Sequence, residues 1–188
     1  MPGQKRRGRP KKQWGGVDKA AVLRCAHSIL ATQGLEKLTF RALAAELGVT
    51  AMAVKHHVGS RDQLLSDLAA HIFEGIDAGV AGETPSAELR QLLVRYSGLT
   101  LKNADLVRYL LSNPNCMPKA LSEFTTQIRR RTQAINHGDS DDAMLNLLID
   151  YVHGFVFAAD AAPTEVSLTL ENCMNSIDWL LDVMESRR

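Results

Sequence analysis

The feature that most constrains the fold is the spacing of apolar residues at intervals of three and four positions, which recurs along most of the 188-residue chain. This spacing places apolar side chains on one face of an α-helix. No stretch shows sustained alternation of apolar and polar residues rich in β-branched side chains, so no sheet is expected. The sequence therefore predicts an all-α protein.

Capping residues and helix breakers divide this pattern into about nine helices. Thr39, Thr50 and Ser60 are side-chain acceptors that precede helical stretches, and Gly34 and Gly48 stand where helices are expected to end. The predicted helices span residues 17–33, 40–47, 51–58, 61–78, 85 to beyond 96, 103–112, 118–136, 140–161 and 164–186.

Charge is distributed unevenly along the chain, although the formal net charge is only +1. Residues 1–61 carry twelve Lys and Arg against three acidic residues, whereas residues 62–188 carry ten basic against eighteen acidic residues. Such an asymmetry indicates that only one half of the chain binds a polyanion. Nucleic acid is the first candidate, and an anionic membrane surface is the second.

Several other classes of protein are disfavoured by what the sequence lacks. No apolar run approaches the length of a membrane span, and the basic N-terminus does not resemble a secretory signal, so a cytoplasmic protein is expected. Cys25, Cys116 and Cys173 are widely spaced and are expected to be reduced thiols rather than disulfides or metal ligands. No catalytic, metal-binding or phosphate-loop motif is found, so we expect neither an enzyme nor a bound cofactor.

The stretch from Thr39 to His57 has the pattern of a helix-turn-helix. Leu43 and Val54 supply apolar contacts between two short helices, and Gly48 permits the tight turn between them. The early positions of the second helix are expected to face outward, where a recognition helix reaches base edges in the major groove of DNA. The basic charge of this part of the chain supports the same interpretation.

Residues 17–75 resemble the N-terminal region of TetR-type transcriptional regulators, on the runs LTFRALAAELGV at 38–49 and HVGSRDQLL at 57–65. The resemblance implies an Ω-shaped, all-helical homodimer that represses promoters until a small-molecule effector releases it. It also implies a helix-turn-helix DNA-binding domain at 17–62 and an effector-binding and dimerisation domain at 63–188. The helix at 61–78 is expected to connect the two domains.

The same resemblance assigns DNA contacts to the helix-turn-helix. Residues expected to face the bases are Arg41, Ala51, Met52, Lys55 and His57. Residues expected to hold phosphates are Thr39, Thr50, His56 and Arg61. The pair His56 and His57 is equally typical of a solvated helix end, because adjacent helical residues cannot both face one groove.

Residues 1–16 are expected to form a disordered basic arm, because they contain six Lys or Arg and only one large apolar residue, Trp14. The arm includes an Arg-Gly-Arg-Pro core formed by Arg7, Gly8, Arg9 and Pro10. This core resembles an AT-hook, in which arginines enter the negative potential of a narrow, A·T-rich minor groove. The alternative is a basic tail that attracts phosphates without specificity.

The C-terminal half supplies candidates for an effector pocket and a dimer interface. Polar residues expected in the pocket are Tyr96, Arg108, Tyr109, Asn113, Tyr151 and His153. Residues 144–162 are apolar almost all round, which predicts a helix that contacts both its own core and a partner subunit. Residues expected in this interface are Phe155, Ala158, Ala159, Leu170, Met174 and Ile177. The alternatives are an ordinary core in place of a pocket and two core helices of a monomer.

The sequence therefore predicts a regulator that binds a pseudo-palindromic operator in double-stranded DNA as a homodimer and is released by a small molecule. One alternative is a regulator that acts through a protein partner without any ligand. Another is an architectural protein that binds A·T-rich DNA through its arm.

Overall fold

A computed structural model describes residues 17–137, 141–163 and 165–186, which form nine α-helices, one short 3-10 helix and no strand. The elements are α1 (Lys19–Gln33), α2 (Phe40–Leu47), α3 (Ala51–Val58), α4 (Arg61–Ile72), α5 (Pro85–Lys102), α6 (Ala104–Ser112), η1 (Pro114–Cys116), α7 (Lys119–Ile135), α8 (Ala143–Ala161) and α9 (Leu170–Glu185). The predicted all-α class and the number of α-helices are confirmed for the described residues.

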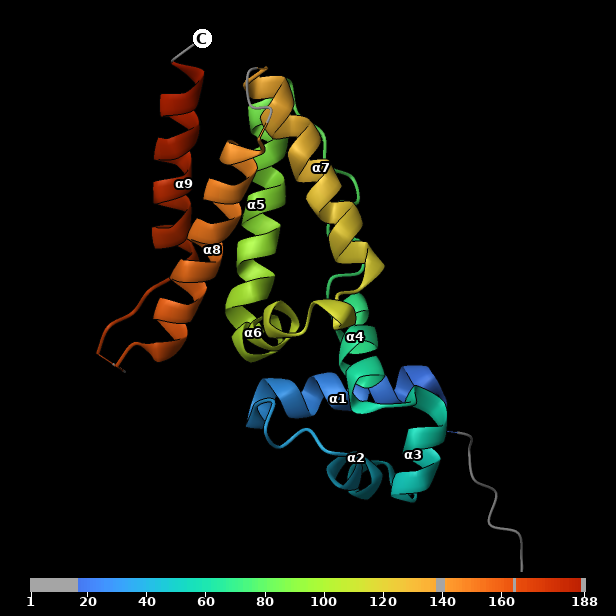
Figure 1. The fold of residues 1–188 in the computed structure, drawn as a ribbon. Helices are drawn as coiled ribbons and strands as arrows, with labels where there is room; N and C mark the ends of the chain where they lie inside the picture. The colour runs from blue at the N-terminus through green and yellow to red at the C-terminus, as the bar shows by residue number, and fades with distance from the viewer. Residues whose placement is uncertain (1–16, 138–140, 164, 187–188) are drawn as a thin grey trace, which may run out of the picture.

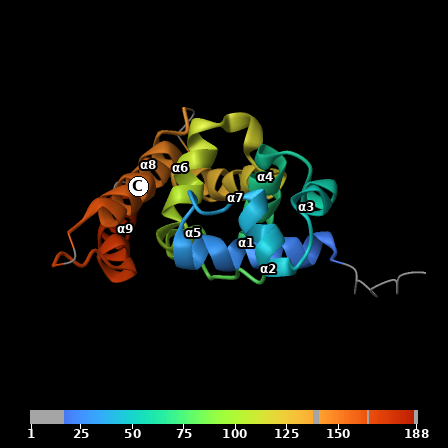
Figure 2. The same ribbon diagram turned by 90° about the horizontal axis from the view of Figure 1, so that it is seen from below.

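The helices form two layers (Figure 1). Helices α1, α2 and α3 make a basal layer, and α5, α7, α8 and α9 stand above it as an upper bundle. Helix α4 joins the layers, and it contacts α1 and α3 below and α6 and α7 above. Seen from below, α3 and the pair α8 and α9 lie at opposite ends of the molecule (Figure 2).

Local capping explains the short helices of the basal layer. The hydroxyls of Thr39, Thr50 and Ser60 each accept a hydrogen bond at 3.1 Å from the backbone N–H three residues later, which satisfies a free donor at the start of α2, α3 and α4. Gly48 ends α2 in the left-handed region, with φ 65°, as the sharp turn to α3 requires. Leu43 is fully buried between these helices and α1.

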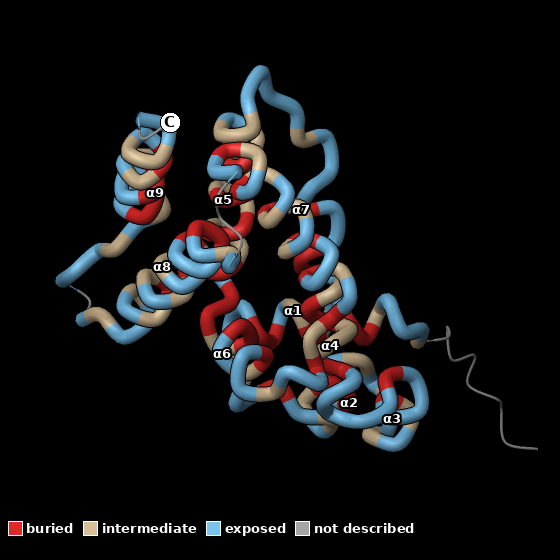
Figure 3. The backbone as a smooth tube through the Cα atoms, turned by 45° about the horizontal axis from the view of Figure 1, so that its top comes forward, coloured by how far each residue is buried: buried red, intermediate tan, exposed pale blue. Residues whose placement is uncertain are grey.

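Helix α5 is the centre of the upper bundle, since it contacts α7, α8 and α9. Figure 3 shows that most residues of α5 are buried or intermediate, whereas α8 and α9 alternate between buried and exposed residues. A two-pronged ion pair between Arg90 and Asp178, with N–O distances of 2.6 and 2.8 Å, fastens α9 to α5. Helix α9 thus docks on the core by one side only.

Two predicted helix bounds are wrong because of turns and caps. Helix α4 ends at Ile72 rather than at 78, and Gly75 and Gly79 adopt φ of 68° and 64°, which is incompatible with a helix. Helix α9 begins at Leu170 rather than at 164. Its start is set by a capping box in which the Thr169 hydroxyl accepts from the N–H of Asn172, while the Asn172 side chain accepts from the N–H of Thr169.

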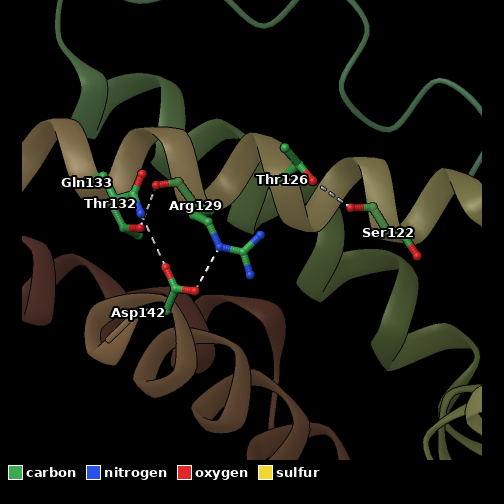
Figure 4. A network of polar contacts seen from close by, with 6 residues as sticks. All are labelled: Ser122, Thr126, Arg129, Thr132, Gln133 and Asp142. Atoms are coloured by element: carbon green, nitrogen blue, oxygen red, sulfur yellow. Dashed lines mark hydrogen bonds and ion pairs between the residues drawn. The ribbon is translucent and has the colours of Figure 1, made fainter. Parts of the chain in front are cut away.

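The predicted start of the eighth helix at 140 is also wrong, because Asp142 adopts a left-handed conformation with φ 56° and α8 begins at Ala143. The Asp142 carboxylate accepts a hydrogen bond from Arg129 Nε at 2.8 Å and one from Gln133 Nε2 at 3.5 Å (Figure 4). Both donors lie on α7. These contacts hold the residue before α8 in a conformation that non-glycine residues rarely adopt.

Helix α8 is the one described helix that is long and apolar enough to cross a membrane, with a mean hydropathy of 1.2. Core helices of proteins outside membranes meet the same two criteria, so this is weak support for a span. Only 28% of its most apolar 18-residue stretch is buried within the protomer. Leu147 is the large apolar side chain of α8 that stays exposed among the described residues.

Candidate functional site

The candidate recognition surface is the exposed side of α3 and of the start of α2. Met52, Lys55, His56 and His57 are all exposed on α3, and Arg41 is exposed on α2. Met52 is 76% exposed, which is a high value for a large apolar side chain. Val54 and Val58 are buried against the rest of the basal layer and set the orientation of α3. The remaining predicted base-facing residue, Ala51, is half-buried at the first turn of α3.

The residues predicted to hold phosphates lie at the edges of this recognition surface. Thr39 and Thr50 are exposed at the N-termini of α2 and α3, where their hydroxyls already act as caps. Arg61 has a structural contact that the sequence did not reveal. Its guanidinium donates to the Leu38 carbonyl at 2.6 Å and to the Leu35 carbonyl at 3.3 Å, which braces the loop before α2.

A cavity of about 170 Å³ lies where α5, α6, α7 and α8 meet, above the basal layer. Tyr96 and His153 line it as predicted, and the Tyr96 hydroxyl forms a hydrogen bond of 2.7 Å with His153 Nε2. Burial lowers the pKa of His153 and raises the pKa of Tyr96. Both groups are therefore neutral near pH 7. The apolar walls include Phe73, Phe124 and Leu110, which are apolar residues that no sequence motif marks.

The other four residues predicted for the pocket lie outside its lining. Arg108 pairs with Asp160 at 2.7 Å, and its guanidinium lies 4.9 Å from the ring centre of Phe157, so it joins α6 to α8. The Asn113 side chain donates to the Tyr109 carbonyl at 2.8 Å, and Tyr151 packs near Phe155 on another side of α8. The spacing of residues along a helix does not show which of its sides faces the cavity, so residues on adjacent sides were included in the prediction.

Tyr109 links α6 to α4, the helix that joins the layers, through a short hydrogen bond. Its hydroxyl donates to the Asp62 carboxylate at 2.7 Å, which connects α6 to the first turn of α4. This hydrogen bond raises the pKa of Tyr109 to about 12. The two residues are 47 positions apart, so no local signal in the sequence could have paired them.

The predicted dimer interface divides into two groups. Met174 and Ile177 are buried in the protomer's own core, on the side of α9 that packs on α5, so their assignment to an outer face is corrected. Phe155, Ala159 and Leu170 are half-buried, and Ala158 is exposed. The large apolar residues on the outer side are Leu147 of α8, 47% exposed, and Trp179 of α9, 65% exposed.

The predicted AT-hook-like core, Arg7 to Pro10, lies outside the described residues. Among the residues that are described, no group of three or more His, Cys, Asp or Glu side chains is arranged to hold a metal ion.

Comparisons with known proteins agree with this architecture. Residues 22–68 match the family model of bacterial regulatory proteins of the tetR family. No protein of curated function matches the chain by sequence. BioQ, solved with its double-stranded DNA operator, is 25% identical and has a TM-score of 0.73; the match covers 90% of this chain and 99% of BioQ.

Two further structures share the fold. BioQ of Mycobacterium smegmatis is 23% identical, with a TM-score of 0.75 over 92% of this chain and 100% of its own. ActR of Streptomyces coelicolor, solved with (S)-DNPA, is 18% identical, with a TM-score of 0.57 over 90% of this chain and 96% of its own. The helix-turn-helix region of the chain therefore matches the tetR family of bacterial regulatory proteins, and the chain as a whole shares the fold of these solved structures.

Proposed function

We propose that this DNA-binding regulator is a homodimeric repressor that leaves a pseudo-palindromic operator when a small molecule enters the cavity between α5, α6, α7 and α8. The observation that carries the proposal is that one helix, α6, both lines the cavity and bonds through Tyr109 to Asp62 of α4, the helix that directly follows the helix-turn-helix. A ligand can shift the protein between two states only if it binds them unequally. Because α6 contacts both the cavity and the helix that follows the helix-turn-helix, a ligand in the cavity can bind the two states with different affinities.

The route from the cavity to the recognition surface consists of short contacts. Leu110 of α6 lines the cavity, and the neighbouring Tyr109 bonds to Asp62 at 2.7 Å. Asp62 follows Arg61, which holds the Leu38 carbonyl one residue before the cap of α2. A displacement of α6 would therefore act on the loop that positions α2, and through it on α3.

The outer sides of α8 and α9 support a second copy of the chain as the partner. Leu147, Gly154 and Ala158 follow one another at spacings of seven and four residues, so they share a side of α8 that is exposed. An added Cβ at Gly154 would meet no atom within 4 Å. Trp179 is exposed on the adjacent α9. A symmetric pairing of these helices would bury the apolar surface that the protomer leaves uncovered.

The oligomeric state tests this pairing. We expect the full chain to sediment as a dimer and Leu147→Glu to sediment as a monomer, because the glutamate would be buried without a partner. Met52→Glu is the matched control, since it places the same charge on an exposed apolar residue of the distant α3. A Leu147→Glu variant that remains a dimer would refute this interface.

Selection from a random pool of duplexes, followed by footprinting, tests the DNA-binding mode. We expect two half-sites about 34–36 Å apart, as two recognition helices of a dimer require. Diffuse protection of A·T-rich DNA would instead support an architectural protein.

Release by a ligand is tested with the small molecule that co-purifies with the dimer. Its affinity should fall in the presence of the selected operator, by the same factor by which it weakens operator binding. Equal affinity with and without operator would exclude release by this ligand.

A further inference from the structure

The cavity offers no charge to a ligand. None of the eleven described residues that line it is Lys, Arg, Asp or Glu. Its polar side chains are Tyr96, Thr125 and His153, and the Thr125 hydroxyl donates to the Leu121 carbonyl of its own helix. A charged group placed in such a site loses its hydration without gaining an ion pair, which costs several kcal/mol or more. The cavity therefore disfavours ligands that carry a charge into it.

The hydrogen-bonded pair of Tyr96 and His153 leaves one position open to a ligand. If Tyr96 donates to His153, its oxygen still accepts, and if His153 donates, the Tyr96 hydrogen is free. A ligand hydroxyl can either donate or accept, so it complements both tautomers. The pair thus favours a neutral ligand with one hydroxyl group.

The size and walls of the cavity suit a single ring. Its volume of about 170 Å³ is close to that of an engineered cavity of about 150 Å³ that binds benzene, and it is below the range of about 300–1,000 Å³ typical of sites for drug-sized molecules. The ring of Tyr96 is stacked on that of Phe124, with centroids 5.2 Å apart, and Phe73 lies 6.0 Å from it. Aromatic side chains thus occupy the region beside the open hydrogen-bonding position.

We propose that the cavity selects neutral phenols of one ring, with the ring among the aromatic side chains and the hydroxyl on the Tyr96–His153 pair. This inference rests on the proposed function in so far as it takes the cavity to be the effector site. It goes further by naming the chemical class of the effector. It predicts that the polar pair distinguishes a phenol from its hydrocarbon and that a carboxylate of the same size is rejected.

Calorimetric titration of the full chain without DNA tests the proposal, with p-cresol, toluene and 4-methylbenzoate as probes. We expect p-cresol to bind about two- to tenfold more tightly than toluene, as one neutral hydrogen bond allows. We expect no binding of 4-methylbenzoate at millimolar concentration. Equal affinity for p-cresol and toluene, tighter binding of 4-methylbenzoate, or no binding of any probe would overturn the proposal.

A pair of matched variants assigns the preference to the cavity. Tyr96→Phe should reduce the preference for p-cresol over toluene, because only His153 Nε2 is then left to bond the hydroxyl, and it should leave the toluene affinity unchanged, a result that general loosening of the fold would not produce. Tyr151→Phe makes the same change outside the cavity lining and should keep the preference. Preference retained in Tyr96→Phe would overturn the assignment.

Displacement of the protein from its selected operator by p-cresol is then measured separately. Binding without displacement would refute the proposed release mechanism and leave the ligand class standing.

Discussion

Replacement of Arg61 by glutamine separates a structural role of this side chain from a role in DNA binding. The bond to the Leu38 carbonyl is short and partly buried, and charge-assisted bonds of this kind contribute about 1.5–3 kcal/mol. The longer bond to the Leu35 carbonyl is exposed and contributes little. Removal of a cation from the first turn of α4 stabilises the helix by about 0.3–1 kcal/mol. We therefore expect Arg61→Gln to lower the free energy of unfolding by about 1.5 kcal/mol.

Arg41→Gln is the matched control, because it removes the same charge from the first turn of α2. By the same helix-dipole argument, it should leave the free energy of unfolding unchanged or raise it by up to about 1 kcal/mol. Urea unfolding at equal protein concentration measures these values, and fluorescence anisotropy with a DNA duplex at several salt concentrations measures the charge contacts. Arg41→Gln should lower the affinity for the selected operator, because Arg41 is expected to face the bases. The slope of log affinity against log salt should stay unchanged in Arg61→Gln, because its guanidinium is held by backbone carbonyls. The reasoning is refuted if Arg61→Gln keeps native stability and flattens the slope instead.

Three other predictions concern the arm, the link between the layers and the cavity. Deletion of residues 1–12 removes six basic side chains. If about four of them bind phosphates, the slope of log affinity for DNA against log salt concentration should flatten by several units. An unchanged slope would show that the arm does not contribute to DNA binding. A double-mutant cycle of Tyr109→Phe and Asp62→Asn should give a coupling of about 0.5–1 kcal/mol in urea unfolding, since this bond is exposed; a coupling near zero would argue against the proposed route. Burial lowers the pKa of His153, and the nearby Asp150 carboxylate only partly offsets this effect. As the pH falls, the imidazole is therefore protonated in the unfolded chain before it is protonated in the folded protein. The free energy of unfolding should accordingly decrease as the pH drops below about 6.5. His153→Gln should reduce that fall, and equal pH profiles would contradict the assignment.

The helix-turn-helix could be predicted closely because its determinants are local. Thr39 and Thr50 cap helices through bonds to residues three positions away, and Gly48 supplies a backbone conformation that other residues rarely adopt. These interactions are encoded within a few residues of where they act. Once the Thr50 cap fixes where α3 begins, the positions of its apolar residues show which of its side chains are exposed.

Helix bounds were wrong where the determinant was a weaker local signal or a tertiary contact. The capping box of Thr169 and Asn172 is present in the sequence but was not distinguished from the apolar pattern before it. The left-handed conformation of Asp142 depends on Arg129, thirteen residues earlier on another helix.

The sequence by itself determined the helical class, the helix-turn-helix and the separation of a basic from an acidic half, because periodicity, caps and charge are properties of short stretches. Only the tertiary structure decided which apolar residues face inward. Met174 and Trp179 lie on one amphipathic helix, yet the first is buried against α5 and the second is exposed. The cavity and the bond between Tyr109 and Asp62 likewise arise from residues far apart in the chain. Their geometry depends on how whole helices pack, which no local pattern specifies.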